Sequence, residues 1–391
     1  MTTPVNVQRT ASPKAKPDDA TLKFGTVFTD HMFLEDYDAR GWVNGRIEPY
    51  HHLSLDPAAA VLHYGQEIFE GLKAFRGVDG RVRLFRPRRH AERLANSARR
   101  VCIPPMDVDH VIDSFARLVS LDRDWVPHAL GTSLYVRPTI IATEAFLGVR
   151  PAANYLYYII LSPVGAYHSA GLAPIKILVE EQYARAVQGG VGAAKTGGNY
   201  AASLLASEEA RQLGFDQVLW LDGAQHRFID EVGTMNIMVR IKDEVLTPTL
   251  GGTILAGVTR DSVLTLLRDW GIAVSERPVT IDEVVKAAAD GALREVWGTG
   301  TAGGISPVEE LGFRGQRLIV NGGQTGEWTR RLLDALQAIQ YGMGQDPHEW
   351  MLEVQAEDLV DEASRESFPA SDSPGWSGHT HPTRDELPAR G

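Results

Sequence analysis

The sequence predicts a mixed α/β protein with two domains. Apolar stretches rich in β-branched and aromatic residues alternate with segments whose apolar residues recur at helical spacing. The chain has 391 residues, a length at which two domains are expected. A stretch rich in Gly, Pro and Ser, SPVGAYHSAG, interrupts the pattern near the middle. We therefore expect a small N-terminal domain over 23–165, a linker over 166–171 and a larger domain over 172–352.

In the small domain, the pattern begins with two strands, at 25–37 and 41–55. The Asn44–Gly45 pair is typical of a tight hairpin turn. Apolar residues at helical spacing predict a helix over 58–75. The remaining predictions are strands at 81–87, 133–143 and 154–163 and helices at 88–100 and 108–121.

In the large domain, strands and helices alternate around a loop of small residues at 189–203. The predicted strands lie at 175–180, 217–222, 226–231, 234–241, 272–277 and 293–300. The predicted helices lie at 199–213, 260–270, 281–290 and 326–341.

Both ends of the chain have the composition of disordered segments. Residues 1–22 are polar and contain prolines, and we expect a disordered leader. Residues 353–391 hold nine acidic and three basic residues and few apolar ones, which predicts an acidic, disordered tail. The tail contains a His379-Thr380-His381 triplet without a further ligand nearby, so we predict no metal site.

The overall composition excludes several classes of protein. A net charge of −11 disfavours a nucleic-acid partner, which requires a basic surface. No apolar run approaches the ~20 residues of a membrane span, and the first residues lack the apolar core of a secretory signal. The single cysteine, Cys102, excludes an intrachain disulfide, and its apolar neighbours predict a packed thiol. We expect a cytoplasmic protein.

The loop GGVGAAKTGGNYAAS at 189–203 surrounds one lysine, Lys195, with Gly and Ala. A nucleotide-binding P-loop is one interpretation, but Ala194 replaces its second glycine and no apolar strand directly precedes it. A flexible loop with an exposed lysine is another. That interpretation leaves unexplained why GGNYAAS and a helical pattern follow at once.

The third interpretation is a lysine that forms a Schiff base with pyridoxal phosphate. Small residues let the cofactor approach the backbone, and shielding from water favours the neutral, nucleophilic amine. Such a site also needs a carboxylate for the ring nitrogen, a donor for the ring oxygen and a phosphate cup. Glu231 and Tyr200 are candidates for the first two. The turns at 257–263 and 298–304 are candidates for the cup, and Arg86 would add positive charge.

These residues are part of a longer ordered set of motifs, namely YGQEIFEGLKAFRG, VRLFRP, SLYVRP, GGVGAAKTGGNY, QVLWLDG, EVGTMN, GVTR and GTGTA. The set resembles the branched-chain amino acid aminotransferases, which are fold-type-IV pyridoxal-phosphate enzymes. The match extends from Phe24 to HEWM at 348–351. The resemblance implies a small N-terminal α/β domain, a larger C-terminal α/β pseudo-barrel domain and pyridoxal 5'-phosphate as cofactor.

The resemblance also implies roles for individual residues around the cofactor. Lys195 would be the catalytic residue, bonded to the cofactor and, once freed, shuttling the substrate α-proton. Glu231 would keep the ring nitrogen protonated, and Tyr200 would hydrogen-bond the ring oxygen. The phosphate would be held by Arg86, Val258, Thr259 and Thr301.

Substrate contacts are implied in the same way. The turn at Thr301 and Ala302 would offer backbone N–H groups to the substrate carboxylate. Tyr64, Tyr135 and Arg137 would assist that turn. An apolar pocket would be formed by Phe28, Phe69 and Tyr167. Leu147 and Val149 would reach in from the partner subunit of a homodimer with a shared active site.

The implied reaction moves the amino group between L-leucine, L-isoleucine or L-valine and 2-oxoglutarate, by a ping-pong mechanism through pyridoxamine phosphate. The same fold contains D-amino-acid and amine transaminases and aminodeoxychorismate lyases, and these alternatives share the lysine and the glutamate. The YVRP and GTGTA segments favour the branched-chain enzyme. A non-catalytic protein that acts through its acidic tail is the alternative from another class. The sequence does not rank the three amino acids or give the direction of the flux.

Overall fold

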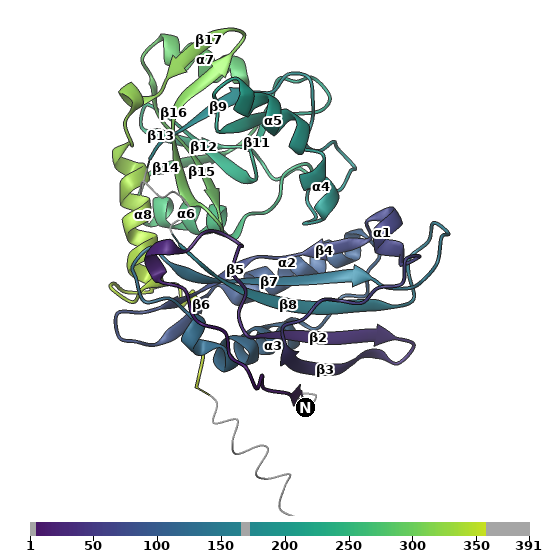
Figure 1. The fold of residues 1–391 in the computed structure, drawn as a ribbon. Coiled ribbons are helices and arrows are strands. Elements are labelled where there is room, and N and C mark those ends of the chain that lie inside the picture. The colour runs from purple at the N-terminus through teal and green to yellow at the C-terminus, as the bar shows by residue number, and fades with distance from the viewer. Residues whose placement is uncertain (1–4, 166–172, 357–391) are drawn as a thin grey trace, which may run out of the picture. The chain divides into compact units, whose positions relative to one another are not determined.

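The computed structural model describes residues 5–165 and 173–356. In these residues the strands form two nine-stranded sheets, one built mainly before the gap and one entirely after it (Figure 1). Helices pack on both sheets, so the mixed α/β class that the sequence predicts is confirmed.

The first sheet has the strand order β1-β3-β2-β8-β7-β5-β6-β18, and β4 pairs with β7. Its pairs are antiparallel except for β1 with β3. The strands are β1 (Asn6–Val7), β2 (His31–Asp38), β3 (Gly41–Pro49), β4 (Glu67–Phe69), β5 (Leu72–Arg76), β6 (Val82–Phe85), β7 (Ser133–Ala142), β8 (Tyr155–Val164) and β18 (Met351–Glu353).

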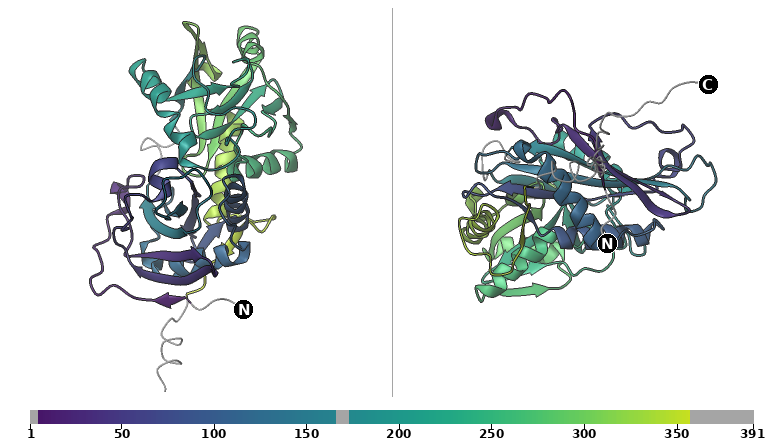
Figure 2. Two further views of the ribbon diagram at one scale, coloured as in Figure 1. Left: turned by 90° about the vertical axis from the view of Figure 1, so that its right-hand side faces the viewer. Right: turned by 90° about the horizontal axis from the view of Figure 1, so that it is seen from below.

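Two amphipathic helices cover one face of the first sheet (Figure 2). They are α2 (Pro87–Arg100) and α3 (Val108–Leu121), and a short helix, α1 (Ala60–Tyr64), precedes β4. Leu94 of α2 and Phe115 of α3 are buried against the sheet. Asp107 begins α3, because its side chain accepts a hydrogen bond from the N–H of His110. The burial of these apolar faces places α2 beside β4.

The second sheet closes on itself. Its order is β11-β10-β9-β16-β15-β12-β13-β14, β17 pairs with β16, and a further pairing of β11 with β12 completes a ring. The strands are β9 (Ile175–Val179), β10 (Gln217–Leu221), β11 (Ile229–Val232), β12 (Met235–Ile241), β13 (Glu244–Thr247), β14 (Ala273–Glu276), β15 (Leu293–Gly300), β16 (Gly304–Phe313) and β17 (Gln316–Ile319). The pseudo-barrel that the resemblance implies is confirmed.

Five helices accompany this ring: α4 (Gly197–Ala201), α5 (Leu204–Gln212), α6 (Val258–Asp269), α7 (Ile281–Ala289) and α8 (Glu327–Gln340). α6 and α8 also pack on the first sheet (Figure 1), since Leu267 and Leu336 share an apolar cluster with Phe75 of β5 and Phe85 of β6. This cluster joins the two sheets at one side and leaves the cavity described below between them.

Two local predictions in the small domain are wrong. Asn44–Gly45 lies inside β3, and the hairpin turns between Asp38 and Gly41 instead. The register shifts at this point and Asn44 has a φ of 61°, so the pair forms a β-bulge, which requires the same left-handed conformation as the predicted turn. The helix expected over 58–75 ends at Tyr64, because Gly65 adopts a left-handed φ and the chain then enters β4 and β5.

The structure also differs from the predictions at the two ends. In the segment predicted as a disordered leader, β1 pairs with β3, and the N–H of Lys14 donates to Asp30 at 2.9 Å. β18, which lies within the range predicted for the large domain, returns to the first sheet and pairs with β6. The next residues are ordered as well, since Val354 is buried and its N–H donates to Val82 O.

Several predictions concern residues at or beyond the limits of the described chain. The linker at 166–171, most of the acidic tail and the His379-Thr380-His381 triplet lie outside the described residues.

Cys102, for which packing was predicted, is exposed because the chain leaves α2 there with a left-handed φ of 57°. Across residues 5–165 and 173–356, no helix is both long and apolar enough to cross a membrane.

Candidate active site

A cavity lined by residues from both sheets surrounds Lys195. Its empty volume is about 1120 Å³, including the part that is open to solvent. The N-terminal half contributes Phe24, Phe69, Gly71, Arg93, Tyr135 and Arg137. The C-terminal half contributes Arg185, Lys195, Asn199, Tyr200, Ser203, Glu231, 233–236, Leu255, 257–259 and 299–303.

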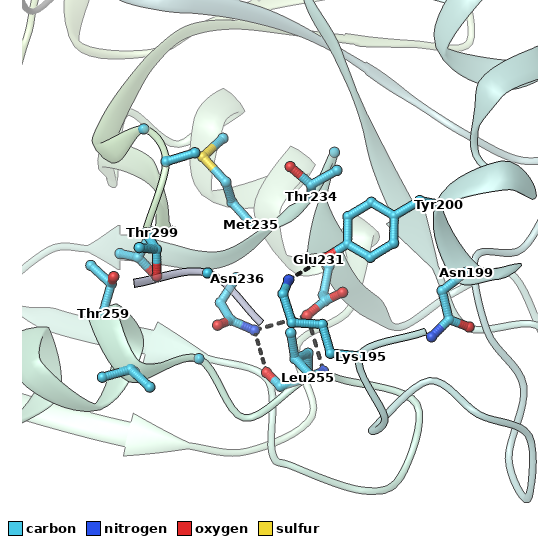
Figure 3. Close-up of a pocket in the computed structure, with 18 of the residues that line it drawn as sticks. Lys195, Asn199, Tyr200, Glu231, Thr234, Met235, Asn236, Leu255, Thr259 and Thr299 are labelled. Atoms are coloured by element: carbon cyan, nitrogen blue, oxygen red, sulfur yellow. Dashed lines mark hydrogen bonds between the residues drawn. The ribbon is translucent and has the colours of Figure 1, made fainter. Parts of the chain in front are cut away.

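Lys195 immediately precedes α4 and points into this cavity (Figure 3). Its Nζ donates a hydrogen bond to Tyr200 Oη at 2.5 Å, because Tyr200 follows on the first turns of α4. The ring of Phe69 lies 4.7 Å from the same Nζ. Burial lowers the pKa of Lys195 to about 7, and the positive charge of Arg93 acts in the same direction. Near pH 7, Lys195 is therefore a neutral amine in a large share of the molecules. The neutral amine is the form that attacks a carbonyl carbon.

Glu231 is the buried carboxylate of the site, with 4% of its surface exposed. It lies on β11 directly opposite Asn236 of β12, whose side-chain N–H donates to Oε1 at 2.9 Å (Figure 3). The N–H of Leu255 donates to the same oxygen at 3.1 Å, and Arg185 Nε lies 2.7 Å from Oε2. Burial raises the pKa of Glu231 although the charge of Arg185 opposes this. The carboxylate is therefore suited to share a proton with a basic nitrogen.

The opposite side of the cavity has the features of an anion site. Gly257 precedes α6, and the N–H groups of the first helical turn have no intrahelical partners. A Cβ at Gly257 would lie 1.9 Å from Asn236 Oδ1, so only glycine fits there. The buried hydroxyl of Thr299 has no hydrogen-bond partner among the described residues. The turn containing Thr301 and Ala302, between β15 and β16, completes this wall.

The arginine predicted for the phosphate is not in the cavity wall. Arg86 begins α2, and its guanidinium donates to Asp261 at 2.6 Å and to Ser262 at 2.7 Å. Arg93, two helical turns further along α2, lines the cavity instead. Its guanidinium is held by Glu70, at 2.6 and 2.9 Å, and by the carbonyl of Ala256. The guanidinium of Arg86 also lies 3.4 Å from the carbonyl oxygen of Val258 on the first turn of α6, so its role at the phosphate stays a prediction.

The predicted substrate residues fall into two groups. Phe69, Tyr135, Arg137, Thr301 and Ala302 line the cavity. Phe28, Tyr64, Leu147 and Val149 do not, and Tyr167 lies outside the described residues. Phe28 stacks on Tyr50, with ring centroids 5.4 Å apart, whereas Phe24 is among the lining residues. Tyr64 is 44% exposed and its hydroxyl donates to Leu147 O.

Sequence reasoning gave no individual role to several lining residues, among them Phe24, Arg93, Arg185, Asn236 and Thr299, although Thr299 lies in the 298–304 turn predicted for the phosphate cup. Asn236 and Thr299 belong to the EVGTMN and GTGTA motifs, so those motifs were the signal. Arg93 lies on the same face of α2 as the buried Ser97, a helical spacing visible in the sequence. Arg185 lies in an irregular segment between β9 and the lysine loop, and no pattern marks it.

The residues present fit pyridoxal phosphate. The cavity holds an amine with a lowered pKa, a hydroxyl beside it, a buried carboxylate and an anion site with an unpartnered hydroxyl. These are the four groups that such a cofactor requires. The geometry thus defines a pyridoxal-phosphate-dependent class of enzyme.

Comparison with known proteins agrees with this class. Residues 67–311 match the amino-transferase class IV family. The chain is 53% identical to branched-chain-amino-acid aminotransferase 2 of Bacillus subtilis, over 90% of this chain and 97% of that one. The chain therefore belongs to the class IV aminotransferases, and the resemblance to the branched-chain enzymes among them is confirmed.

Solved structures give the same result for the fold. The branched-chain amino acid aminotransferase of Escherichia coli has a TM-score of 0.69 and 26% identity, covering 83% of this chain and 99% of that one. The branched-chain amino acid aminotransferase of Thermobaculum terrenum, solved in its PLP form, has a TM-score of 0.68 and 23% identity. That match covers 83% of this chain and 98% of the other one, and it bears on the fold alone.

Proposed function

We propose that this aminotransferase transfers the amino group between L-leucine, L-isoleucine or L-valine and 2-oxoglutarate, by a ping-pong mechanism through pyridoxamine phosphate. The observation that carries the proposal is the Lys195–Tyr200 hydrogen bond at 2.5 Å, in a cavity that also holds the buried Glu231. The names of the relatives support the substrate class.

Each of the protein's groups around the cofactor has its own role in the proposed reaction. When bound, pyridoxal phosphate supplies an electron sink that makes the α-proton of an amino acid acidic. Lys195 Nζ takes that proton and returns it, since its lowered pKa leaves it neutral near pH 7. Glu231 would hold the proton of the ring nitrogen, and Tyr200 would donate to the ring oxygen. Arg86, Val258, Thr259 and Thr301 would hold the phosphate, and Arg93 in the cavity wall would add positive charge.

The proposed substrate site has a polar end for the α-carboxylate and an apolar surface for the side chain. The α-carboxylate is received by backbone N–H groups at Thr301 and Ala302 and by the hydroxyl of Tyr135. Phe69 provides apolar surface for the branched side chain. That surface also excludes water from the reacting amine.

Glutamate and 2-oxoglutarate bring a second carboxylate, which needs a cation. Three arginines line the cavity, but Arg93 and Arg185 are already paired with glutamates. Arg137 has no carboxylate within ion-pair distance in the described residues, and it donates to Tyr135 Oη at 3.2 Å. Its Nε is buried without a partner, and its guanidinium lies 4.8 Å from the centroid of the Phe69 ring. We therefore assign the second carboxylate to Arg137.

We also propose a homodimer with a shared active site. Leu147 and Val149 are 62% and 87% exposed, in the connection between β7 and β8. Tyr64 bonds to Leu147 and so belongs to the same exposed surface. All three residues would reach the cavity of the partner subunit, because they do not line the cavity of their own chain. The exposed Leu62 extends this apolar surface.

The proposed domains are a small one over 23–165, completed by β18, and a larger one around the ring of strands. We propose a cytoplasmic enzyme without nucleic-acid or membrane partners. The acidic composition supports this proposal.

The visible absorption spectrum of the purified protein, before and after addition of L-leucine, tests the proposed function. We expect a cofactor band that L-leucine removes and 2-oxoglutarate restores, with one equivalent of oxo acid released in the first step. A Lys195→Ala variant should not respond. Loss of the band only with D-leucine or an amine would support the alternative transaminases. Release of pyruvate from aminodeoxychorismate without an acceptor would support the lyase, and no band after incubation with pyridoxal phosphate would overturn the proposal.

A further inference from the structure

The peptide groups on both sides of Lys195 are hydrogen-bonded to the N-terminal half of the chain. The N–H of Lys195 donates to Ser97 Oγ of α2 at 2.9 Å. The N–H of Phe69 in β4 donates to the carbonyl of Lys195 at 3.0 Å. Both groups therefore have partners from elements that belong to the first sheet, although Lys195 leads into α4 beside the second.

A third contact holds the residue that begins α4. Glu67, at the start of β4, accepts a hydrogen bond from the N–H of Gly197. A Cβ at Gly197 would lie 2.2 Å from Glu67 Oε1, so this approach requires glycine. Hydrogen bonds thus hold the N–H and the carbonyl of Lys195 itself, and the N–H of Gly197 two residues later.

These contacts fix the direction in which the Lys195 side chain leaves the backbone. The Phe69 ring, on the strand that holds the Lys195 carbonyl, lies 4.7 Å from Nζ. Ser97 is 1% exposed, so its hydroxyl has no access to bulk water as an alternative partner. The amine and the backbone of the same residue are therefore positioned by one strand and one helix.

We propose that Ser97 and Glu67 are positioning residues for the reaction, and that together with the N–H of Phe69 they form a clamp that aims the Lys195 amine from the other half of the molecule. The proposal rests on the proposed function, because it assigns the proton transfer to Lys195. Neither side chain touches the substrate or the cofactor in this role. Each acts through the peptide groups of residues 195–197.

The kinetic test compares variants that remove or keep each hydrogen-bond acceptor. Ser97→Ala and Glu67→Leu should each lower kcat on the order of tenfold, because small misplacements of a reacting group are costly. The KM for L-leucine should change by less than about twofold, since its contacts remain, whereas 2-oxoglutarate is used at saturation because Glu67 also acts on the charge of Arg137. Glu67→Gln should keep most of the activity, because its amide oxygen still accepts the N–H of Gly197.

A second readout does not depend on activity. Hydrogen exchange of the holoenzyme reports the protection of the amides of Lys195 and Gly197. Ser97→Ala should speed exchange at Lys195, and Glu67→Leu at Gly197, each by about 5- to 10-fold, as expected for a lost hydrogen bond. Glu67→Gln should leave the exchange at Gly197 close to that of the wild type.

Two control variants separate the clamp from general destabilisation. Arg100→Met removes contacts from the same helix to the carbonyls of Gly189 and Gly190, which lie earlier in the lysine loop and do not touch the peptides of Lys195. Ser114→Ala removes another buried serine hydroxyl of the first sheet's helices. Both should leave kcat and the two amides unchanged.

The outcomes distinguish failure of the clamp from failure of the function. If Ser97→Ala and Glu67→Leu match the controls in kcat and in exchange while the wild type is active, the clamp is overturned. If the exchange changes but kcat does not, the contacts exist but do not position the amine, and the proposal also falls. If the wild type has no aminotransferase activity, the proposed function fails, and the clamp as a positioning device for proton transfer fails with it.

Discussion

Two buried glutamates adjoin the cavity, and their surroundings differ. Glu70 follows β4 and accepts two hydrogen bonds from Arg93, at 2.6 and 2.9 Å, and one from His90, at 3.0 Å. Glu231 on β11 has one close arginine nitrogen and two neutral donors. Both carboxylates are removed from water, so the difference lies in the number and charge of their donors.

The two environments move the carboxyl pKa in opposite directions. Burial by itself raises the pKa of both groups. At Glu70 the charge and the paired hydrogen bonds of Arg93, with the bond from His90, more than offset burial and lower the pKa. At Glu231 burial prevails over Arg185 and the pKa is raised. The Glu70–Arg93 pair thus stays charged, and we call such a pair an ionic anchor. Glu231, in contrast, can share a proton although Arg185 lies beside it.

The largest effect expected from this comparison is on stability. Glu70→Gln removes the negative charge but keeps the shape, and leaves Arg93 buried without its counter-ion. We expect the free energy of unfolding to fall by about 3 kcal/mol, measured by urea denaturation of the holoenzyme. The matched Glu231→Gln variant should lose less, since burial already disfavours the charged form there and Asp230 still acts on the charge of Arg185. Equal losses would contradict the distinction.

Activity should show the reverse order. Glu231→Gln removes the group that we propose keeps the ring nitrogen protonated, and kcat should fall on the order of 10²-fold with a smaller loss of stability than in Glu70→Gln. Steady-state kinetics with L-leucine and 2-oxoglutarate give this value. A variant with wild-type kcat would mean that Glu231 is an anchor like Glu70.

A smaller effect is expected from the partner of Glu231. Arg185→Met removes the charge that opposes the effect of burial on Glu231, so the pKa of this carboxyl should rise further. We expect kcat to fall by about tenfold and the pH at which activity is half-maximal on the acidic side to move upward. An unchanged pH profile would show that Asn236 and Leu255 alone determine the state of Glu231.

The pH dependence of the cofactor-free protein gives a separate test, of the burial of Lys195. The pKa of Lys195 is about 7 in the folded chain and 10.5 for a lysine in water, so the unfolded chain binds more protons between these values. The free energy of unfolding should therefore rise with pH from about 7 to about 10.5. Lys195→Met should remove this part of the slope in urea titrations at several pH values. The same slope in both proteins would mean that Lys195 is in contact with water and does not have a lowered pKa.

The predicted site residues that the structure brings together around the cavity lie in contiguous motifs. Lys195 and Tyr200 are brought together by one helical turn, and Thr259 lies on the helix that the Gly–Thr turn begins. Local geometry is sufficient for these residues, because a few backbone angles fix their relative position. Glu231 is similar, since it lies on the strand that precedes a glycine turn.

The sequence is less informative where packing between distant elements decides. Arg86 and Arg93 are on the same helix, and only the packing of α2 determines which of them faces the cavity. The sequence pattern did not predict β16, because a proline and acidic residues are atypical of a buried strand. The structure nevertheless buries this strand in the ring. Asn44 has the left-handed φ that an Asn-Gly turn would require, but Gly45 does not, and the pair lies in a bulge rather than a turn.

The return of β18 to the first sheet has a consequence for synthesis. β6 pairs with β5 from residues close in sequence, but its other edge is covered by residues 351–353, which are made after the entire second sheet. During translation, the nascent first sheet therefore presents an open strand edge while the ring and α8 are being completed. Such an edge can pair with strands of other chains. The interval before β18 is made is therefore the stage of synthesis at which this chain is most prone to aggregate.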